Sequence, residues 1–459
     1  MLKGGELVSI YLEDSKAPVD NEVTAFDLEV TGEIPKQLEG RWLRNGPNPF
    51  GSVDSEAYHW FLGDGMIHGV RLREGKAEWY RNRWVRGRDL AEKLEEEPPA
   101  GSSFGDSGFS PNTSVIGHGG TTFALVEAGT TPVAMTYNLE TVGYDNFDGT
   151  LPGAFSAHTK LDPIKNELHA VCYAYPNILD RLQHVVIGED NRVKKVTDIP
   201  IEGMPMVHDM SLTENYVIIY DLPVCVDLDL AIAGNPFPLA WQNDRQSRIG
   251  LLPRDGQASD IVWCEAPLCY VFHPVNAFEV HEDEHENKII IDLCRYERIF
   301  QKDLQGPAGD SSSQLARWTV NPETRTVSEE IVSDMAHEFP AHDPRVVGRR
   351  HRYAYTALGF DLGPTYRTDM ETGEVIFHDH GEGRFGGEPI FVPREGSTSE
   401  EDGWVLVCVN DRKGSPAELV ILDATNIKEK PIARIHLPQR VPDGFHGAWV
   451  PDSVVSPDE

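Results

Sequence analysis

Four of the 17 histidines in this chain share a local setting that suits a metal ligand. Each is a single imidazole in a run of small or apolar residues typical of a strand. They are His158, His208, His273 and His446, separated by 50, 65 and 173 residues. Such spacing cannot form a local finger, so the side chains converge only if several β units point one strand end at a common axis. A core imidazole with a satisfied hydrogen bond explains any one of them as well, and spacing alone does not select this set.

Short strands are the elements that would have to position these histidines. The 41 glycines and 32 prolines divide the whole length into short runs, and no linker or repeat of 40–50 residues is visible. The β-rich runs are Glu78–Val85, Phe123–Val126, Glu167–Tyr175, Tyr216–Tyr220, Ile289–Leu293, Ala316–Val320, Tyr353–Leu358, Trp404–Val409 and Glu418–Leu422. Asp89–Glu97 is the best helix candidate, because it stops before two prolines. The pattern predicts an all-β sandwich, barrel series or propeller.

The charge balance restricts the partners. With 41 basic and 74 acidic residues, the formal charge is 41 − 74 = −33, which repels phosphates and anionic headgroups. We therefore expect no nucleic acid partner, and nothing implies an obligate protein partner. The six cysteines lack a framework spacing and are expected to be reduced and buried. No signal-like segment opens the chain and no apolar run reaches the roughly 18 residues of a membrane span, so we expect a cytoplasmic location.

The segment Pro223–Trp241 stands apart because it is largely apolar and contains Gly234 and several prolines. One interpretation is an ordinary buried crossover. The other is an apolar surface or tunnel mouth that takes up a lipophilic substrate and gives the protein a transient, peripheral contact with a membrane. The sequence leaves both open.

Two short motifs match catalytic signatures without the structural context that those signatures need. Gly101–Gly105 fits G-x-S-x-G, but no buried strand precedes it and no helix follows. Gly381–Gly386 fits G-x-G-x-x-G outside any βαβ unit. Neither serine hydrolysis nor dinucleotide binding is expected.

A set of ordered motifs resembles the carotenoid cleavage oxygenase family, which includes stilbene-cleaving and related alkene-cleaving enzymes. The resemblance runs from about Leu38 to Pro451. The motifs that carry it are Glu39–Pro49, His59–His68, Asn112-Thr113, Ala124–Glu127, Ser156–His158, His208-Asp209, Phe272–Asn276, Glu338–Pro340, Gly387–Phe391 and Gly444–Gly447.

The resemblance implies a fold and a metal centre. The fold would be a seven-bladed β-propeller over residues 1–459 as a single domain, with a cap of loops and short helices over an iron site. The four histidines named above would bind Fe(2+). Three glutamates, Glu127, Glu338 and Glu388, would hydrogen-bond to the outer ring nitrogens, with Glu279 as a lower-ranked substitute. Thr113 matches a position whose methyl group obstructs one of the two remaining coordination sites, which leaves one for dioxygen.

The implied reaction is oxidative cleavage of a conjugated C=C bond by dioxygen to two carbonyl products. Phe61, Phe272 and Phe339 are candidate walls of the substrate pocket, although core packing explains each of them too. Stilbene-cleaving members carry a lysine where this chain has Val126, and valine cannot contact a phenol. That difference favours a carotenoid or apocarotenoid over a stilbene or other aryl alkene. A non-catalytic propeller that binds a ligand, and retinoid-type ester isomerisation, are the alternatives from other classes.

Overall fold

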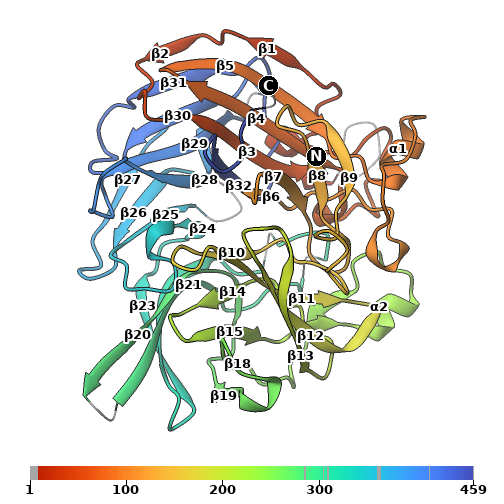
Figure 1. The fold of residues 1–459 in the computed structure, drawn as a ribbon, viewed down its shortest axis with the longest axis vertical. Helices are drawn as coiled ribbons and strands as arrows, with labels where there is room; N and C mark the ends of the chain where they lie inside the picture. Colours follow the sequence, from red (N-terminus) through yellow and green to blue (C-terminus); the bar gives the residue numbers. More distant parts are fainter. Residues whose placement is uncertain are drawn as a thin grey trace. The chain divides into compact units, whose positions relative to one another are not determined.

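The computed structural model describes residues 9–283, 286–302, 304–307, 310–358, 363–412 and 414–457. The chain forms two compact units. Unit 1 comprises Met1–Ala157, Leu362–Thr365 and Phe377–Glu459, and unit 2 comprises His158–Asp361 and Tyr366–Ile376. Within each unit the chain is built from β-sheets, antiparallel except for one parallel pair of strands among the described residues, with very little helix (Figure 1). The all-β fold class is confirmed.

Unit 1 holds three sheets. In the first, strands from both ends of the sequence pair, because β3 lies between β4 and the late strand β32. The sheets, in hydrogen-bonded order, are β1 (Thr24–Phe26), β5 (Lys76–Trp84), β4 (Gly65–Arg73), β3 (Gly40–Pro47) and β32 (Gly447–Pro451); β6 (Ser114–His118), β7 (Thr121–Leu125), β8 (Val133–Met135) and β9 (Thr141–Tyr144); and β2 (Val30–Gly32), β31 (Ala433–His436), β30 (Glu418–Asp423), β29 (Gly403–Asp411) and β28 (Arg384–Pro393).

Unit 2 contains a four-stranded sheet, a longer sheet and a small hairpin. Their strands, in hydrogen-bonded order, are β10 (Thr159–Asp162), β11 (Glu167–Ala174), β12 (Ile178–Ile187) and β13 (Val193–Pro200); β14 (Met210–Leu212), β15 (Tyr216–Asp221), β18 (Arg248–Pro253), β19 (Val262–Glu265), β23 (Thr326–Ser333), β22 (Ser313–Asn321), β21 (Glu286–Tyr296) and β20 (Tyr270–Asp283); and β16 (Val224–Val226) and β17 (Leu239–Trp241). A further sheet has the order β24 (Glu338–Ala341), β25 (Tyr353–Ala357), β26 (Thr365–Asp369) and β27 (Val375–His378).

The strand pattern follows from side-chain alternation. Along β22, buried and half-buried residues alternate, so one face packs into the core. The alternation breaks only where Leu315 and Ala316 are both buried, and there the pairing with β23 shifts register. In unit 1, Trp42, Leu406 and Ile435 lie in one buried cluster that joins two sheets. All nine β-rich runs of the sequence lie in or overlap observed strands.

The helices differ from the sequence prediction. The first helix, α1 (Arg88–Lys93), is shorter than the predicted Asp89–Glu97, because Glu95 adopts a left-handed backbone with φ 58°. A second helix, α2 (Leu228–Ile232), was not predicted. It is capped by Asp227, whose side chain accepts hydrogen bonds from the N–H groups of Asp229 and Leu230. The 3-10 turns are Ile10–Leu12, Asp14–Lys16, Trp60–Leu62, Phe104–Asp106, Ala258–Asp260 and Pro344–Val346.

The apolar segment that contains α2 is buried at both ends and exposed in its middle. Leu228 is 60% exposed and Ile232 is 84% exposed, on a helix with no buried residue. The segment therefore presents an apolar surface, which we call the α2 patch and define as Leu228, Ala231, Ile232, Ala233 and Pro236, all exposed. The six cysteines are free and buried, as expected.

Candidate metal centre

All four histidines lie at or near the start of a strand. His158 directly precedes β10, His208 lies two residues before β14, and His446 directly precedes β32, while His273 lies near the start of β20. Each of these strands is an edge strand of its sheet. The four histidines, although distant in sequence, thus lie at or near the start of an edge strand. For His158, His208 and His273 this strand comes first in the sequence within its group of strands, and for His446 it comes last.

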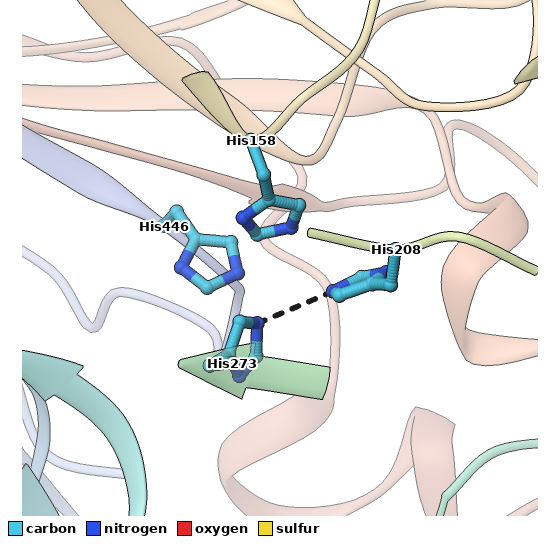
Figure 2. Close-up of side chains that lie close together, drawn as sticks. All are labelled: His158, His208, His273 and His446. Carbon is cyan, nitrogen blue, oxygen red and sulfur yellow. Dashed lines mark hydrogen bonds between the residues drawn. The ribbon is translucent and has the colours of Figure 1, made fainter. Parts of the chain in front are cut away.

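The four imidazoles form a group that could hold a metal ion. Their ligand atoms all lie within 4.8 Å of one another, and three of the four residues are buried (Figure 2). Within unit 2, the ring centroids of His158 and His208 are 4.3 Å apart, and those of His208 and His273 are 5.1 Å apart. The Nε2 atoms of His208 and His273 face each other at 3.2 Å. Figure 2 shows the rings turned towards a common point.

Carboxylates determine the tautomer of two of these rings. His273 Nδ1 lies 2.5 Å from Glu338 Oε2, and His446 Nδ1 lies 2.7 Å from Glu388 Oε1. A carboxylate accepts, so each Nδ1 carries the proton and each Nε2 keeps a lone pair for a metal. Glu338 is completely buried, and Glu388 also accepts from the N–H of Gly447 at 2.6 Å.

A third acidic side chain lies near His158. Asp209 Oδ2 is 3.8 Å from His158 Nδ1 and 2.8 Å from Lys160 Nζ. The other oxygen, Oδ1, accepts from the N–H of Met210 at 2.6 Å. Neither Asp209 nor Lys160 was predicted from the sequence to have a role. The His208-Asp209 pair and the alternation of His158 and Lys160 around a strand start are the signals that could have indicated them.

The backbone of Thr113 is tied to the strand entry that carries His446. The N–H of His446 donates to Thr113 O at 3.0 Å, and Thr113 N–H donates to Leu125 O at 3.1 Å. Thr113 Oγ1 donates to Asn112 Oδ1, whose amide donates to the carbonyls of Phe61 and Gly63. Val126 and Glu127 follow β7 directly and are half-buried. The predicted roles of Thr113, Val126 and Glu127 stay predictions.

Two of the candidate pocket phenylalanines contact the histidines of unit 2. Phe272 packs edge-on against His208 with centroids 4.9 Å apart, and Phe339 stacks on His273 at 5.6 Å. Both are about 1% exposed. In unit 1, Phe61 is half-buried and packs edge-on against Phe445, the neighbour of His446, at 5.3 Å. Their role towards a substrate stays a prediction.

Glu279 holds a turn and does not hydrogen-bond to a histidine ring, which had been predicted for it at lower rank. Its carboxylate accepts from Thr213 Oγ1 at 2.6 Å, from the N–H of Asn215 at 2.8 Å and from Asn215 Nδ2 at 2.9 Å. Both oxygens thus hold the turn between β14 and β15. The prediction that Glu279 could hydrogen-bond to an outer ring nitrogen of one of the four histidines is wrong.

Known proteins that are similar to this chain share one family. A family model described as retinal pigment epithelial membrane protein matches residues 16–451. A carotenoid cleavage oxygenase of Mycobacterium tuberculosis is 41% identical, over 96% of this chain and 97% of that protein. The chain belongs to the carotenoid cleavage oxygenase family. Membership makes it an enzyme, an oxidoreductase of the oxygenase class, and confirms the resemblance drawn from the motifs.

Other members of the carotenoid cleavage oxygenase family extend the comparison. A carotenoid 9,10(9',10')-cleavage dioxygenase of Crocus sativus is 32% identical over 96% of this chain and 89% of that protein. The crystal structure of Pseudomonas brassicacearum lignostilbene dioxygenase matches with a TM-score of 0.86 and 28% identity, over 97% of this chain and 100% of that one. Cobalt-substituted Synechocystis ACO matches with a TM-score of 0.83 and 27% identity, over 95% and 97%. The all-β, propeller-like arrangement is therefore that of the family.

In the part of the chain that the structure describes, neither helix has the length and apolar character that crossing a bilayer requires.

Proposed function

We propose that this chain is a non-haem iron(II) dioxygenase that cleaves a conjugated C=C bond with dioxygen into two carbonyl products, with a carotenoid or apocarotenoid as substrate. The observation that carries the proposal is the group of four histidines, two of which have a carboxylate on Nδ1. The donor chemistry fits iron(II), because imidazole nitrogen is a ligand that divalent iron accepts.

The histidines and the acidic residues behind them would hold the metal. His158, His208, His273 and His446 would bind it, and Glu338 and Glu388 would hold two of the rings in the tautomer that presents Nε2. Glu127 is proposed to do the same for a third ring, on the family's pattern. Bound iron(II) supplies the electron density that relieves the spin barrier between triplet dioxygen and a singlet alkene. Thr113 is proposed to obstruct one of the two remaining positions, so that one stays open.

The aromatic side chains would position the substrate. Phe61, Phe272 and Phe339 offer apolar faces close to the histidines, which suits a polyene and keeps water away from the reacting bond. The half-buried Val126 presents no donor or acceptor to a phenol. The exposed α2 patch gives a lipophilic molecule, or the membrane that contains it, an apolar surface to contact.

A stilbene or other aryl alkene is the second candidate substrate. A similar structure, with a TM-score of 0.86, is that of a protein named lignostilbene dioxygenase. This similarity favours a stilbene substrate. Val126 argues against a substrate recognised through a 4-hydroxyl group.

We also propose that the whole chain, residues 1–459, is one seven-bladed propeller domain. The long sheet of unit 2 supports this, because its two four-stranded groups are joined by a single parallel pair, Glu265 with Thr326. Counting those groups separately, and leaving the β16–β17 hairpin aside, the described strands form seven groups of four or five.

Product analysis tests the proposed reaction. The iron-loaded protein is incubated with carotenoids, apocarotenals and stilbenes, while dioxygen consumption is recorded and products are identified by mass spectrometry. We expect two carbonyl products and one dioxygen consumed per alkene cleaved. Product without dioxygen uptake would point to ester isomerisation instead. Ligand binding without any product across the panel would point to a binding module.

A further inference from the structure

A buried arginine in unit 1 forms no ion pair within the described residues. Arg44 lies in the middle of β3 and is 3% exposed. Its Nη2 donates to Gly444 O at 3.1 Å, and its Nε is buried without a hydrogen-bond partner. Among the described residues, no carboxylate lies within 4 Å of this guanidinium. A buried, uncompensated charge costs several kcal/mol, so such a group normally has a counter-charge.

The neighbouring charged side chains have other partners. The second guanidinium in this region, Arg440, also donates to backbone carbonyls, those of Ala17 and Pro18. The acidic side chains nearby are already engaged. Asp443 accepts from Ser15 Oγ and Asn410 Nδ2, and Glu388 accepts from His446 and Gly447. Among the described residues, neither of these carboxylates accepts a hydrogen bond from Arg44.

Arg44 and His68 line a small, partly open cavity whose free space accommodates a single small guest. His68 is 3% exposed, and burial together with Arg44 and Arg440 lowers its pKa to about 3, so the ring is neutral. Its Nδ1 lies 2.8 Å from the hydroxyl of Tyr80, which accepts from Gln439 Nε2 at 3.0 Å. With the Tyr80 O–H donating to Nδ1, His68 Nε2 carries a proton and is a further donor beside the arginine.

Glycines leave room for this arrangement. A Cβ atom at Gly387 would lie 2.1 Å from Arg44 Nη1, and one at Gly444 would lie 2.9 Å from the Cα of Gly46. No side chain other than glycine fits at these two places without moving the guanidinium or β3. The chain therefore accommodates a cation next to an internal space.

We propose that this cavity binds a chloride-sized monovalent anion as the counter-ion of Arg44. The volume excludes sulfate, phosphate and carboxylate ligands, and the donors suit an acceptor-only guest. The site is also linked to the strand entry that carries His446. Asn45, the residue after Arg44, donates its N–H to His446 O at 2.9 Å and accepts from the N–H of Phe445 at 3.1 Å. The anion thus stabilises the segment 444–446, whether or not a metal is bound.

Bromide diffraction on the wild-type protein is the direct test. Crystals grown in bromide should give one anomalous peak in the cavity beside Arg44 and His68. A cavity that contains only water, with bromide confined to exposed arginines, overturns the proposal. This experiment needs no variant and no iron, so its result is separate from that of the proposed reaction.

Thermal unfolding provides the second test. At constant ionic strength, replacing gluconate by chloride at about 100 times its Kd should raise Tm by about 3 °C for a chain of this length. Arg44→Met should abolish the chloride response, and Arg44→Lys should restore part of it. The matched control is Arg350→Met, because the Arg350 side chain is 72% exposed and pairs with Glu371. An unchanged Tm in chloride for the wild-type protein, or a full response in folded Arg44→Met, would contradict the assignment. If Arg44→Met does not fold, the wild-type response and the bromide peak decide.

Discussion

The Nδ1 atom of His273 lies 2.5 Å from Oε2 of Glu338, a carboxylate with no exposed surface. The same oxygen accepts from the N–H of Phe339 at 2.6 Å. Phe339 has φ 49°, a left-handed conformation that is unfavourable for a bulky residue by about 1–2 kcal/mol. The backbone thus adopts a strained turn that directs its amide at the carboxylate while the phenylalanine ring stacks on His273. One glutamate thus positions both the His273 imidazole and the Phe339 ring that stacks on it.

Replacing His273 by alanine should abolish both iron binding and alkene cleavage, because three imidazoles would remain and Glu338 would lose its partner. Iron content by mass spectrometry and product formation check this. His281→Ala is the control on the same strand, since His281 is exposed and contacts Asn287. A variant that keeps both its iron and its activity would contradict the assignment of His273 as an iron ligand.

Replacing Glu388 by glutamine should weaken iron retention by about 10–100-fold without unfolding the protein, because an amide no longer holds the His446 proton as strongly. Competition with a chelator measures the change. Glu279→Gln should instead lower stability and leave iron affinity unchanged, since Glu279 holds the 213–216 turn. Equal iron affinity in Glu388→Gln and the wild type would contradict the role of Glu388.

Introducing a lysine at position 126 should increase kcat/KM for 4-hydroxystilbenes by at least about tenfold, the effect of one charge-assisted hydrogen bond. Steady-state kinetics with and without the 4-hydroxyl group check this. Val126→Met is the control for size. If all three proteins treat the phenol alike, the argument from Val126 against phenolic substrates has no support.

A charge in the α2 patch should impair uptake of a membrane-dissolved substrate. Ile232 is 84% exposed, so Ile232→Glu should fold normally. We expect its apparent KM for a carotenoid in liposomes to rise at least about tenfold, because an apolar contact worth about 1.5–3 kcal/mol is lost. Kinetics with the same substrate in detergent should not change. Equal KM values in liposomes would remove the α2 patch from the uptake route.

Acid should destabilise the fold through buried neutral histidines. His184 is fully buried, and burial, followed by Lys195 and Arg254, lowers its pKa to about 3. Below the unfolded value of about 6.5, the unfolded chain binds a proton that the folded chain does not, so stability falls as pH falls. The free energy of unfolding should drop by about 1.4 kcal/mol per pH unit for this group between pH 5.5 and 4.

Urea unfolding across that pH range, in the wild type and in His184→Gln, measures the difference in slope. Glutamine keeps a polar group opposite His169 Nδ1, which lies 3.1 Å from His184 Nε2. Parallel pH dependences would show that His184 takes up a proton equally in both states.

The amino-acid sequence by itself determined the strands and the family. Alternating and apolar runs such as Glu418–Leu422 specify strands because side-chain direction in a strand is a local property. The ordered motifs selected four histidines from 17, which spacing alone could not do. Local signals were weaker at helix ends, where the left-handed Glu95 shortened α1 and the Asp227 cap of α2 was overlooked.

Only the tertiary structure decided which polar groups meet. Glu338 and the lower-ranked Glu279 were both candidates to support a histidine, but strand pairing placed Glu279 at a distant turn and Glu338 on His273 Nδ1. Asp209 with Lys160, and Arg44 with its cavity, were also invisible in the sequence. The physical reason is that strand identity depends on neighbours along the chain, whereas contacts such as that between β3 and β32 join residues some 400 positions apart. Their register is set by the packing of the whole core.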